Sequence, residues 1–159
     1  GAFDRAPNLR VLTREGALAA LQRAADAGLV HAVSNNQQGH WYLCNCCTCA
    51  CGILRGMADL GMANVVARSG FVNQVDADLC IGCGACVDRC QFDALALDDV
   101  VRVADARCVG CGVCVPTCPV GALSLVRRPE DEVLPPPVTK RDWREQRAAA
   151  RGLDLDDVL

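Results

Sequence analysis

The sequence predicts an α+β protein of short helices and short strands, stabilised by metal centres as well as by an apolar core. Three observations support this class: there are 13 Cys among 159 residues, only 4% of the residues are aromatic, and one cysteine pattern recurs after 28 residues. A chain of this length buries a limited core, and it has few large rings to fill one. The cysteines are therefore the expected source of further stability.

Composition narrows the classes of function. The cysteine count is odd and the spacing is dense, which favours metal binding over a disulfide scaffold. No secretory signal pattern opens the chain, so a reducing, cytoplasmic location is expected. The stretch 27–54 lacks charge but is too polar for a membrane span. A net charge of −3 without a basic stripe argues against nucleic-acid binding.

The chain divides into three predicted parts. Residues 1–70 form a helix, a hairpin and a cysteine-rich metal-binding segment; residues 71–126 carry the cysteine repeat; residues 127–159 are a Pro-rich linker and a C-terminal helix. In the first part, Thr13 is a predicted N-cap and Gly28 follows the helix. A hairpin across the polar stretch 34–40 would place its second strand at 41–43, and a short helix over 53–60 would end at Gly61.

The last part has little apolar material of its own. The run Pro135, Pro136 and Pro137 favours extended backbone. Thr139 and Asp142 form a predicted capping box for a helix that reaches Arg151. We expect this tail to lie on another surface, with Trp143 as its contact.

The repeat carries the chemistry. Each copy reads C-x2-C-x2-C-x3-C: Cys80, Cys83, Cys86 and Cys90 recur as Cys108, Cys111, Cys114 and Cys118. Three thiolates can surround one cubane iron-sulfur cluster if the loop turns tightly, which the paired glycines in each copy permit. The fourth Cys is expected to start the following helix, point away from its own loop and ligate the other cluster. Two C4 zinc sites or disulfides are the competing interpretations, and clusters acting only as structural staples are a third.

Over about residues 71–126, these motifs make the sequence resemble the bacterial-type two-cluster ferredoxins. The resemblance implies electron transfer through two 4Fe-4S clusters, and a ferredoxin-like α+β fold with a pseudo-twofold pair of short β-hairpins and two short helices. It implies strands at 71–75 with 122–126 and at 96–97 with 101–103. Gln91 stands where the family pattern has Pro, as Pro119 does in the second copy, and this could alter the helix there. The implied ligands are Cys80, Cys83, Cys86 and Cys118 for cluster one, and Cys108, Cys111, Cys114 and Cys90 for cluster two.

A second group of cysteines lies upstream, and we call it the CNCC motif. Its five members are Cys44, Cys46, Cys47, Cys49 and Cys51. They can converge on a metal only if the chain turns within the motif, for example at Gly52 and the following helix. Three interpretations remain open: a third iron-sulfur cluster, a zinc site, or a set of redox or persulfide-carrying thiols. His31 and His40 flank the motif and are weaker candidates for a further ligand.

The segment around Gly28, Asn35 and the CNCC motif is similar to one found in larger 4Fe-4S proteins, where it precedes a C-terminal two-cluster ferredoxin. The resemblance implies that this chain is the C-terminal portion of a longer one, working with a redox protein or with other subunits of a complex. The alternative function is an iron-sulfur oxidoreductase with its catalytic centre at the CNCC motif or in an upstream region. No catalytic residue can be named from the sequence.

Overall fold

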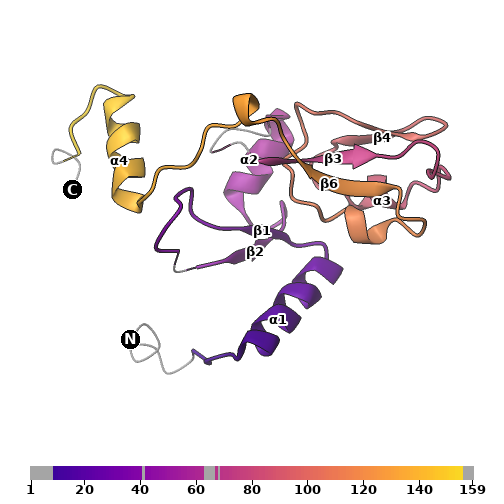
Figure 1. Cartoon of the computed structure of the whole chain (residues 1–159), viewed down its shortest axis with the longest axis horizontal. Coiled ribbons are helices and arrows are strands. Elements are labelled where there is room, and N and C mark those ends of the chain that lie inside the picture. The colour runs from indigo at the N-terminus through magenta and orange to yellow at the C-terminus, as the bar shows by residue number, and fades with distance from the viewer. Residues whose placement is uncertain (1–8, 41, 63–66, 68, 156–159) are drawn as a thin grey trace.

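The computed structural model describes residues 9–40, 42–62, 67 and 69–155. Its strands form three separate two-stranded sheets, β1 with β2, β3 with β6 and β4 with β5 (Figure 1). No helix in the described ranges is both long and apolar enough to cross a membrane. In chain order the elements are α1 (Arg14–Asp26), β1 (Val30–Ala32), β2 (Cys44–Cys46), α2 (Gly52–Leu60), β3 (Phe71–Val75), α3 (Ala85–Arg89), β4 (Leu95–Leu97), β5 (Val101–Val103), β6 (Leu123–Arg127) and α4 (Lys140–Ala149), with single 3₁₀ turns at Val115–Thr117 and Glu130–Glu132.

The strands expected in the repeat region are present. Both pairs are antiparallel, with Phe71 opposite Arg127 in one and Leu95 opposite Val103 in the other. Each sheet takes one strand from each copy of the repeat. The expectation of two hairpins is therefore half wrong: only β4 and β5 are joined by a tight turn, while β3 and β6 bring the two ends of the repeat region together.

The two copies differ in the helix between the third and fourth cysteines. In the first copy this is α3, in which the Asp88 N–H bonds to the Gly84 carbonyl four residues back at 3.3 Å. The equivalent residue in the second copy is Pro116, which has no N–H, and only a 3₁₀ turn forms there. The fourth cysteine ends each element: Cys90 and Cys118 are C-caps. The expectation that they start helices is wrong, because the turn of helix precedes them.

The N-terminal part follows its sequence signals in most places. Thr13 Oγ1 accepts from the Gly16 N–H at 3.1 Å and caps α1, and Gly61 ends α2 in a left-handed conformation. The second hairpin strand is β2, three residues later than expected, and Trp41 lies outside the described residues. Cys46 pairs with the buried Val30, so the strand extends into the CNCC motif itself.

The C-terminal tail is held by the hairpin loop of the same chain. Backbone N–H groups of Gln37 and Gln38 donate to the carbonyls of Pro137 and Val138, both at 2.9 Å. The predicted capping box of Thr139 is formed, and α4 ends at Ala149, slightly earlier than expected. The linker before α4 therefore contacts the hairpin loop of its own chain. Whether Trp143 contacts a partner stays a prediction.

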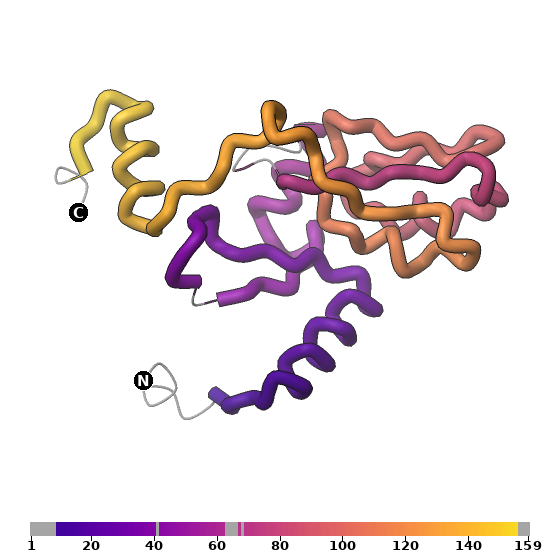
Figure 2. Tube along the Cα trace, in the orientation of Figure 1, coloured from indigo at the N-terminus to yellow at the C-terminus, as the bar shows by residue number. Residues whose placement is uncertain are grey.

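Figure 2 shows the N-terminal part of the chain lying against the repeat region. Three side chains join the two parts, and each is next in sequence to Cys90 or Cys108. Arg89, before Cys90, donates to the carbonyls of Ala25 and Asp26 at the end of α1, at 2.7 and 2.5 Å. Arg107, before Cys108, donates to the Ala58 carbonyl near the end of α2 at 3.0 Å. These cations add a donor to carbonyls at the C-terminal ends of the helices, where positive charge is favoured. The Ala25 and Ala58 carbonyls also accept from the N–H groups of Gly28 and Gly61.

Gln91, which follows Cys90, makes the third docking contact. Its amide oxygen accepts from the Thr48 N–H at 2.8 Å, and its amide nitrogen donates to the Gly28 carbonyl. A proline here, as in the second copy, could make neither bond. The departure from the ferredoxin pattern thus ties the turn of the CNCC motif to the chain beside Cys90.

Replacing Gln91 with Ala should loosen the CNCC turn. The Thr48 N–H would lose its acceptor, at a cost of about 1–3 kcal/mol, so its hydrogen exchange should accelerate by roughly fivefold to a hundredfold. Exchange mass spectrometry of peptides spanning 44–51 measures this. Gln74→Ala, on the exposed side of β3, is the matched control and should leave these peptides unchanged. Equal exchange in Q91A and the unsubstituted protein would contradict the docking role.

Candidate metal centres

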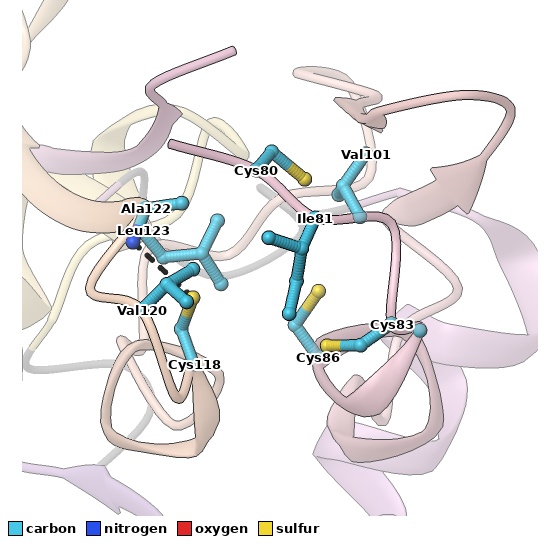
Figure 3. Close-up of a pocket in the computed structure, with 10 residues that line it drawn as sticks. Cys80, Ile81, Cys83, Cys86, Val101, Cys118, Val120, Ala122 and Leu123 are labelled. Carbon is cyan, nitrogen blue, oxygen red and sulfur yellow. Dashed lines mark hydrogen bonds between the residues drawn. The ribbon is translucent and has the colours of Figure 1, made fainter. Parts of the chain in front are cut away.

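The first cavity lies at one end of the repeat region. Cys80, Cys83 and Cys86 reach it from the loop before α3 and from α3 itself, and Cys118 reaches it from the second copy (Figure 3). Apolar residues complete the wall: Ile81, Val101, Val120, Ala122 and Leu123. The cavity holds about 310 Å³, including the part open to solvent. These four cysteines are the set that the resemblance implies for cluster one.

The second cavity is the counterpart of the first in the other half of the repeat. Cys108, Cys111 and Cys114 line it together with Cys90 of the first copy. The space it encloses, about 330 Å³ including the part open to solvent, is similar to that of the first. The structure thus brings the eight repeat cysteines together as two crossed sets of four.

Two glycines let the loops turn close to the neighbouring backbone. Gly82 and Gly110 occupy the same position in the two copies, and each has a φ of 65°. A Cβ at Gly82 would lie 2.9 Å from the Asp99 carbonyl oxygen, and one at Gly110 would overlap the Phe71 carbonyl oxygen. Only glycine fits, because these positions need both a left-handed conformation and close backbone approach.

Backbone N–H groups face the sulfurs of the crossing cysteines. The Ala94 N–H bonds to Cys90 Sγ at 3.4 Å, and the Ala122 N–H bonds to Cys118 Sγ at 3.2 Å. Burial raises the pKa of Cys118, but nearby backbone N–H groups, led by those of Val120 and Ala122, together bring it below its ordinary value. Both sites therefore present donors to a thiolate, as an iron-sulfur site requires.

The deeper thiols need a cation to ionise. Burial raises the pKa of Cys111 to about 11 and, with added repulsion from Cys111 and Cys90, the pKa of Cys114 to about 12. At neutral pH such groups are thiolates only when a bound metal supplies positive charge. A metal cluster in the second cavity would supply that positive charge.

A buried side chain gives a second test of fit. Asn73 on β3 lines the second cavity and is 6% exposed, and neither its Oδ1 nor its Nδ2 has a hydrogen-bond partner within the described structure. A buried amide is costly unless it is bonded, and sulfur atoms in the cavity would supply acceptors. Asn73 could not be identified as functional from the sequence; the one available signal was that its repeat equivalent is the apolar Val101.

The two cavities adjoin through apolar side chains. Cys86 of the first set and Cys114 of the second are buried in one cluster with Leu95, Val101 and Leu123. No polar layer separates them within that cluster, so groups bound in the two cavities would lie a short distance apart.

The CNCC motif turns at Cys47–Cys51, where the Cys51 N–H bonds to the Cys47 carbonyl at 3.0 Å. This is earlier than the expected turn at Gly52. Cys47 and Cys49 form a disulfide with Cα atoms 5.1 Å apart. Cys46 interacts with both Cys44 and Cys51, and burial, then repulsion from Cys51 and Cys44, raises its pKa. As placed, no three His, Cys, Asp or Glu side chains in the described ranges surround a single metal ion.

The helix after the motif affects Cys51. Cys51 is the N-cap of α2, and the backbone N–H groups of Leu54 and Ile53 lower its pKa against the opposing effect of burial. His31 Nδ1 lies 2.6 Å from Asn45 Oδ1, so this ring is engaged by a neighbouring strand residue. His40 is exposed in the hairpin loop. Neither histidine is brought into the cysteine group.

The CNCC motif lies on the cluster-two side of the repeat region. Cys46 and Cys51 pack against the apolar cluster that contains Cys108, and Cys90 and Cys111 pack against it as well. Hydrogen bonds from Arg89, Gln91 and Arg107 cross the same boundary. Sequence reasoning noted Gln91 only as a departure from a pattern and missed both arginines, whose position beside ligand cysteines was the available signal.

Replacing Gly110 with Ala should destabilise the second cavity more than its conformation alone explains. The control is Gly121→Ala, because Gly121 has a similar φ of 69° but open space around its Cβ position. The left-handed conformation costs each variant about 1–2 kcal/mol. The overlap with the Phe71 carbonyl should cost G110A about 1–3 kcal/mol more. Anaerobic urea unfolding followed by circular dichroism compares them, and equal midpoints would contradict the close-approach argument.

Comparison with known proteins identifies one part of the chain. No curated protein sequence matches it. Residues 73–125, about a third of the chain, match the family model of the 4Fe-4S dicluster domain. The match covers both cavities and all eight of their cysteines, and it implies iron-sulfur electron transfer for this region.

Proposed function

We propose that this chain carries electrons between a redox partner and the CNCC motif through two 4Fe-4S clusters bound in the two cavities. Cys80, Cys83, Cys86 and Cys118 would hold cluster one, and Cys108, Cys111, Cys114 and Cys90 would hold cluster two. The observation that carries the proposal is the pair of similar cavities, each lined by four cysteines from both copies of the repeat. When bound, the clusters supply one-electron redox chemistry.

The protein's own contribution is to position the cysteine sulfurs and to shield them from solvent. The apolar walls limit the access of water to the sulfurs, of which Cys83 remains exposed. The Ala94 and Ala122 N–H groups bond to Cys90 Sγ and Cys118 Sγ and stabilise negative charge there. The shared apolar cluster around Cys86 and Cys114 keeps the path between cavities short. We further propose that the chain is a subunit or the C-terminal portion of a cytoplasmic redox complex.

The CNCC motif is the proposed third site on this path. Its place beside Cys108 and Cys90 makes it the natural neighbour of cluster two. As placed, Cys44, Cys46 and Cys51 do not surround a single metal ion. Reduction of the Cys47–Cys49 disulfide would free the turn between them, and the five thiols would then converge on a third iron-sulfur cluster or on zinc. A redox role favours iron-sulfur over zinc, because zinc carries no electrons.

A second candidate function is supported by the Cys47–Cys49 disulfide. In this case the motif is the catalytic centre of an oxidoreductase. Clusters held by the two crossed cysteine sets would supply one-electron reducing equivalents; two electrons with two protons from solvent would convert the Cys47–Cys49 disulfide to two thiols. The reduced pair would then exchange with a disulfide substrate, breaking the substrate's S–S bond and re-forming its own. A low-potential one-electron donor would supply the clusters.

Replacing Cys114 with Ala should remove cluster two. Bound iron in the repeat region should fall from about eight to about four per chain, while the signal of cluster one persists but is perturbed because Cys86 and Cys114 share an apolar cluster. Iron and sulfide analysis with paramagnetic resonance measures this. Cys90→Ala tests the crossing: it should remove the same signal as C114A. If it removes the other signal, the ligand sets are not crossed.

Metal analysis of the anaerobically purified protein should give clearly more than eight irons per chain. Cys46→Ala should then remove the excess iron and stop electron delivery to the motif, while both repeat clusters remain reducible. One zinc with iron near eight would indicate a structural zinc site. No metal at the motif, with two thiols alkylated only after the clusters are reduced, would favour the disulfide centre.

A further inference from the structure

Asn73 is a buried amide without a partner at the second cavity. It lies in the middle of β3, where its backbone pairs opposite Leu125 of β6, so the strand ladder does not use its side chain. The side chain lines the cavity together with the four cysteines, and both of its polar atoms lack a hydrogen-bond partner within the described structure. A polar group in this position costs folding free energy unless something in the cavity bonds to it.

The repeat provides an internal comparison. The residue 28 positions later is Val101, on the equivalent strand β5, and it lines the first cavity. Asn73 is 6% exposed and Val101 is 4% exposed, so the two positions are equally buried. The chain therefore places a donor at one cavity and an apolar side chain at the same place in the other. A buried position in the wall of such a cavity does not require asparagine, because valine fills the equivalent position at the first cavity.

We infer that the Asn73 Nδ2 group donates a hydrogen bond to a sulfur of cluster two and raises its reduction potential, and that cluster one lacks this bond. The inference rests on the proposed function. Sulfurs of the cluster and its thiolates are acceptors, and they carry more negative charge in the reduced state. A donor held at a fixed place therefore stabilises the reduced state more than the oxidised state.

This difference gives the electron path a direction. Cluster two lies beside the CNCC motif, whereas cluster one has the exposed ligand Cys83. Electrons that enter at the exposed end are thus drawn toward the motif.

The test is a reciprocal exchange of the two residues. Asn73→Val gives the second cavity the wall of the first, and should shift the reduced-to-oxidised ratio of cluster two about tenfold toward the oxidised form, which is 59 mV for one electron. Val101→Asn should raise the potential of cluster one. Redox titration followed by paramagnetic resonance measures both potentials, and the cluster-two signal is the one lost in C114A. The potential of the unaltered cluster should not move in either variant.

A measurement on the unsubstituted protein tests the inference even if the variants do not bind their clusters. With ¹⁵N-labelled asparagine, the reduced cluster-two signal should show a hyperfine coupling to an asparagine nitrogen. An absent coupling, an unchanged potential in N73V, or equal shifts of both clusters would overturn the inference. A protein without low-potential cluster signals would instead overturn the proposed function, so the two failures are distinguishable.

Discussion

The structure depends on one requirement: eight thiol sulfurs must converge on two small, mostly apolar cavities. Isolated thiolates are not stable there, as the raised pKa values of Cys111 and Cys114 indicate. The loops must turn tightly enough to place three sulfurs around one space, which is why Gly82 and Gly110 sit against neighbouring carbonyls. The fourth sulfur comes from the other copy, so neither half of the repeat can form its cavity alone.

Duplication makes the two cavities alike, and a few substitutions make them different. The first cavity has apolar Val101 and the exposed Cys83, whereas the second has Asn73. The second cavity is also covered by the N-terminal part of the chain, through Val30 of β1 and Leu54 of α2, and we call this part the covering layer. Phe92 is 2% exposed at the covered end, whereas its repeat equivalent Val120 is 39% exposed at the open end. One end of the region is thus adapted to the chain's own N-terminal part, and the other end faces outward.

The covering layer is attached through helix ends. Arg89 and Arg107 bind carbonyls at the C-terminal ends of α1 and α2, where a helix carries partial negative charge. Gly28 and Gly61 leave room for these guanidinium groups, because a Cβ at either position would lie within about 3 Å of one. Arg89 and Gln91 flank Cys90, and Arg107 precedes Cys108. The contacts that hold the N-terminal part, including the CNCC motif, therefore come from residues next to cysteines of the second cavity.

Much of the site could be predicted from the sequence because its geometry is local. The spacing of cysteines and glycines within each loop, the caps at Thr13, Gly61 and Thr139, and the strand segments all depend on residues a few positions apart. Pro116 was visible in the sequence as well, although its consequence, a 3₁₀ turn in place of a helix, became clear only in comparison with α3.

Tertiary structure decided what depends on contacts between distant segments. The docking of Gln91 on Thr48 and Gly28 joins residues 43 and 63 positions apart, and the CNCC motif packs beside Cys108 of the second cavity. The buried, unpartnered state of the Asn73 amide is also set by tertiary structure, because its burial and its hydrogen-bond partners depend on distant parts of the folded chain. Residue type and spacing thus determined which cysteines can hold metal, and packing decided which cavity is covered and which polar group faces it.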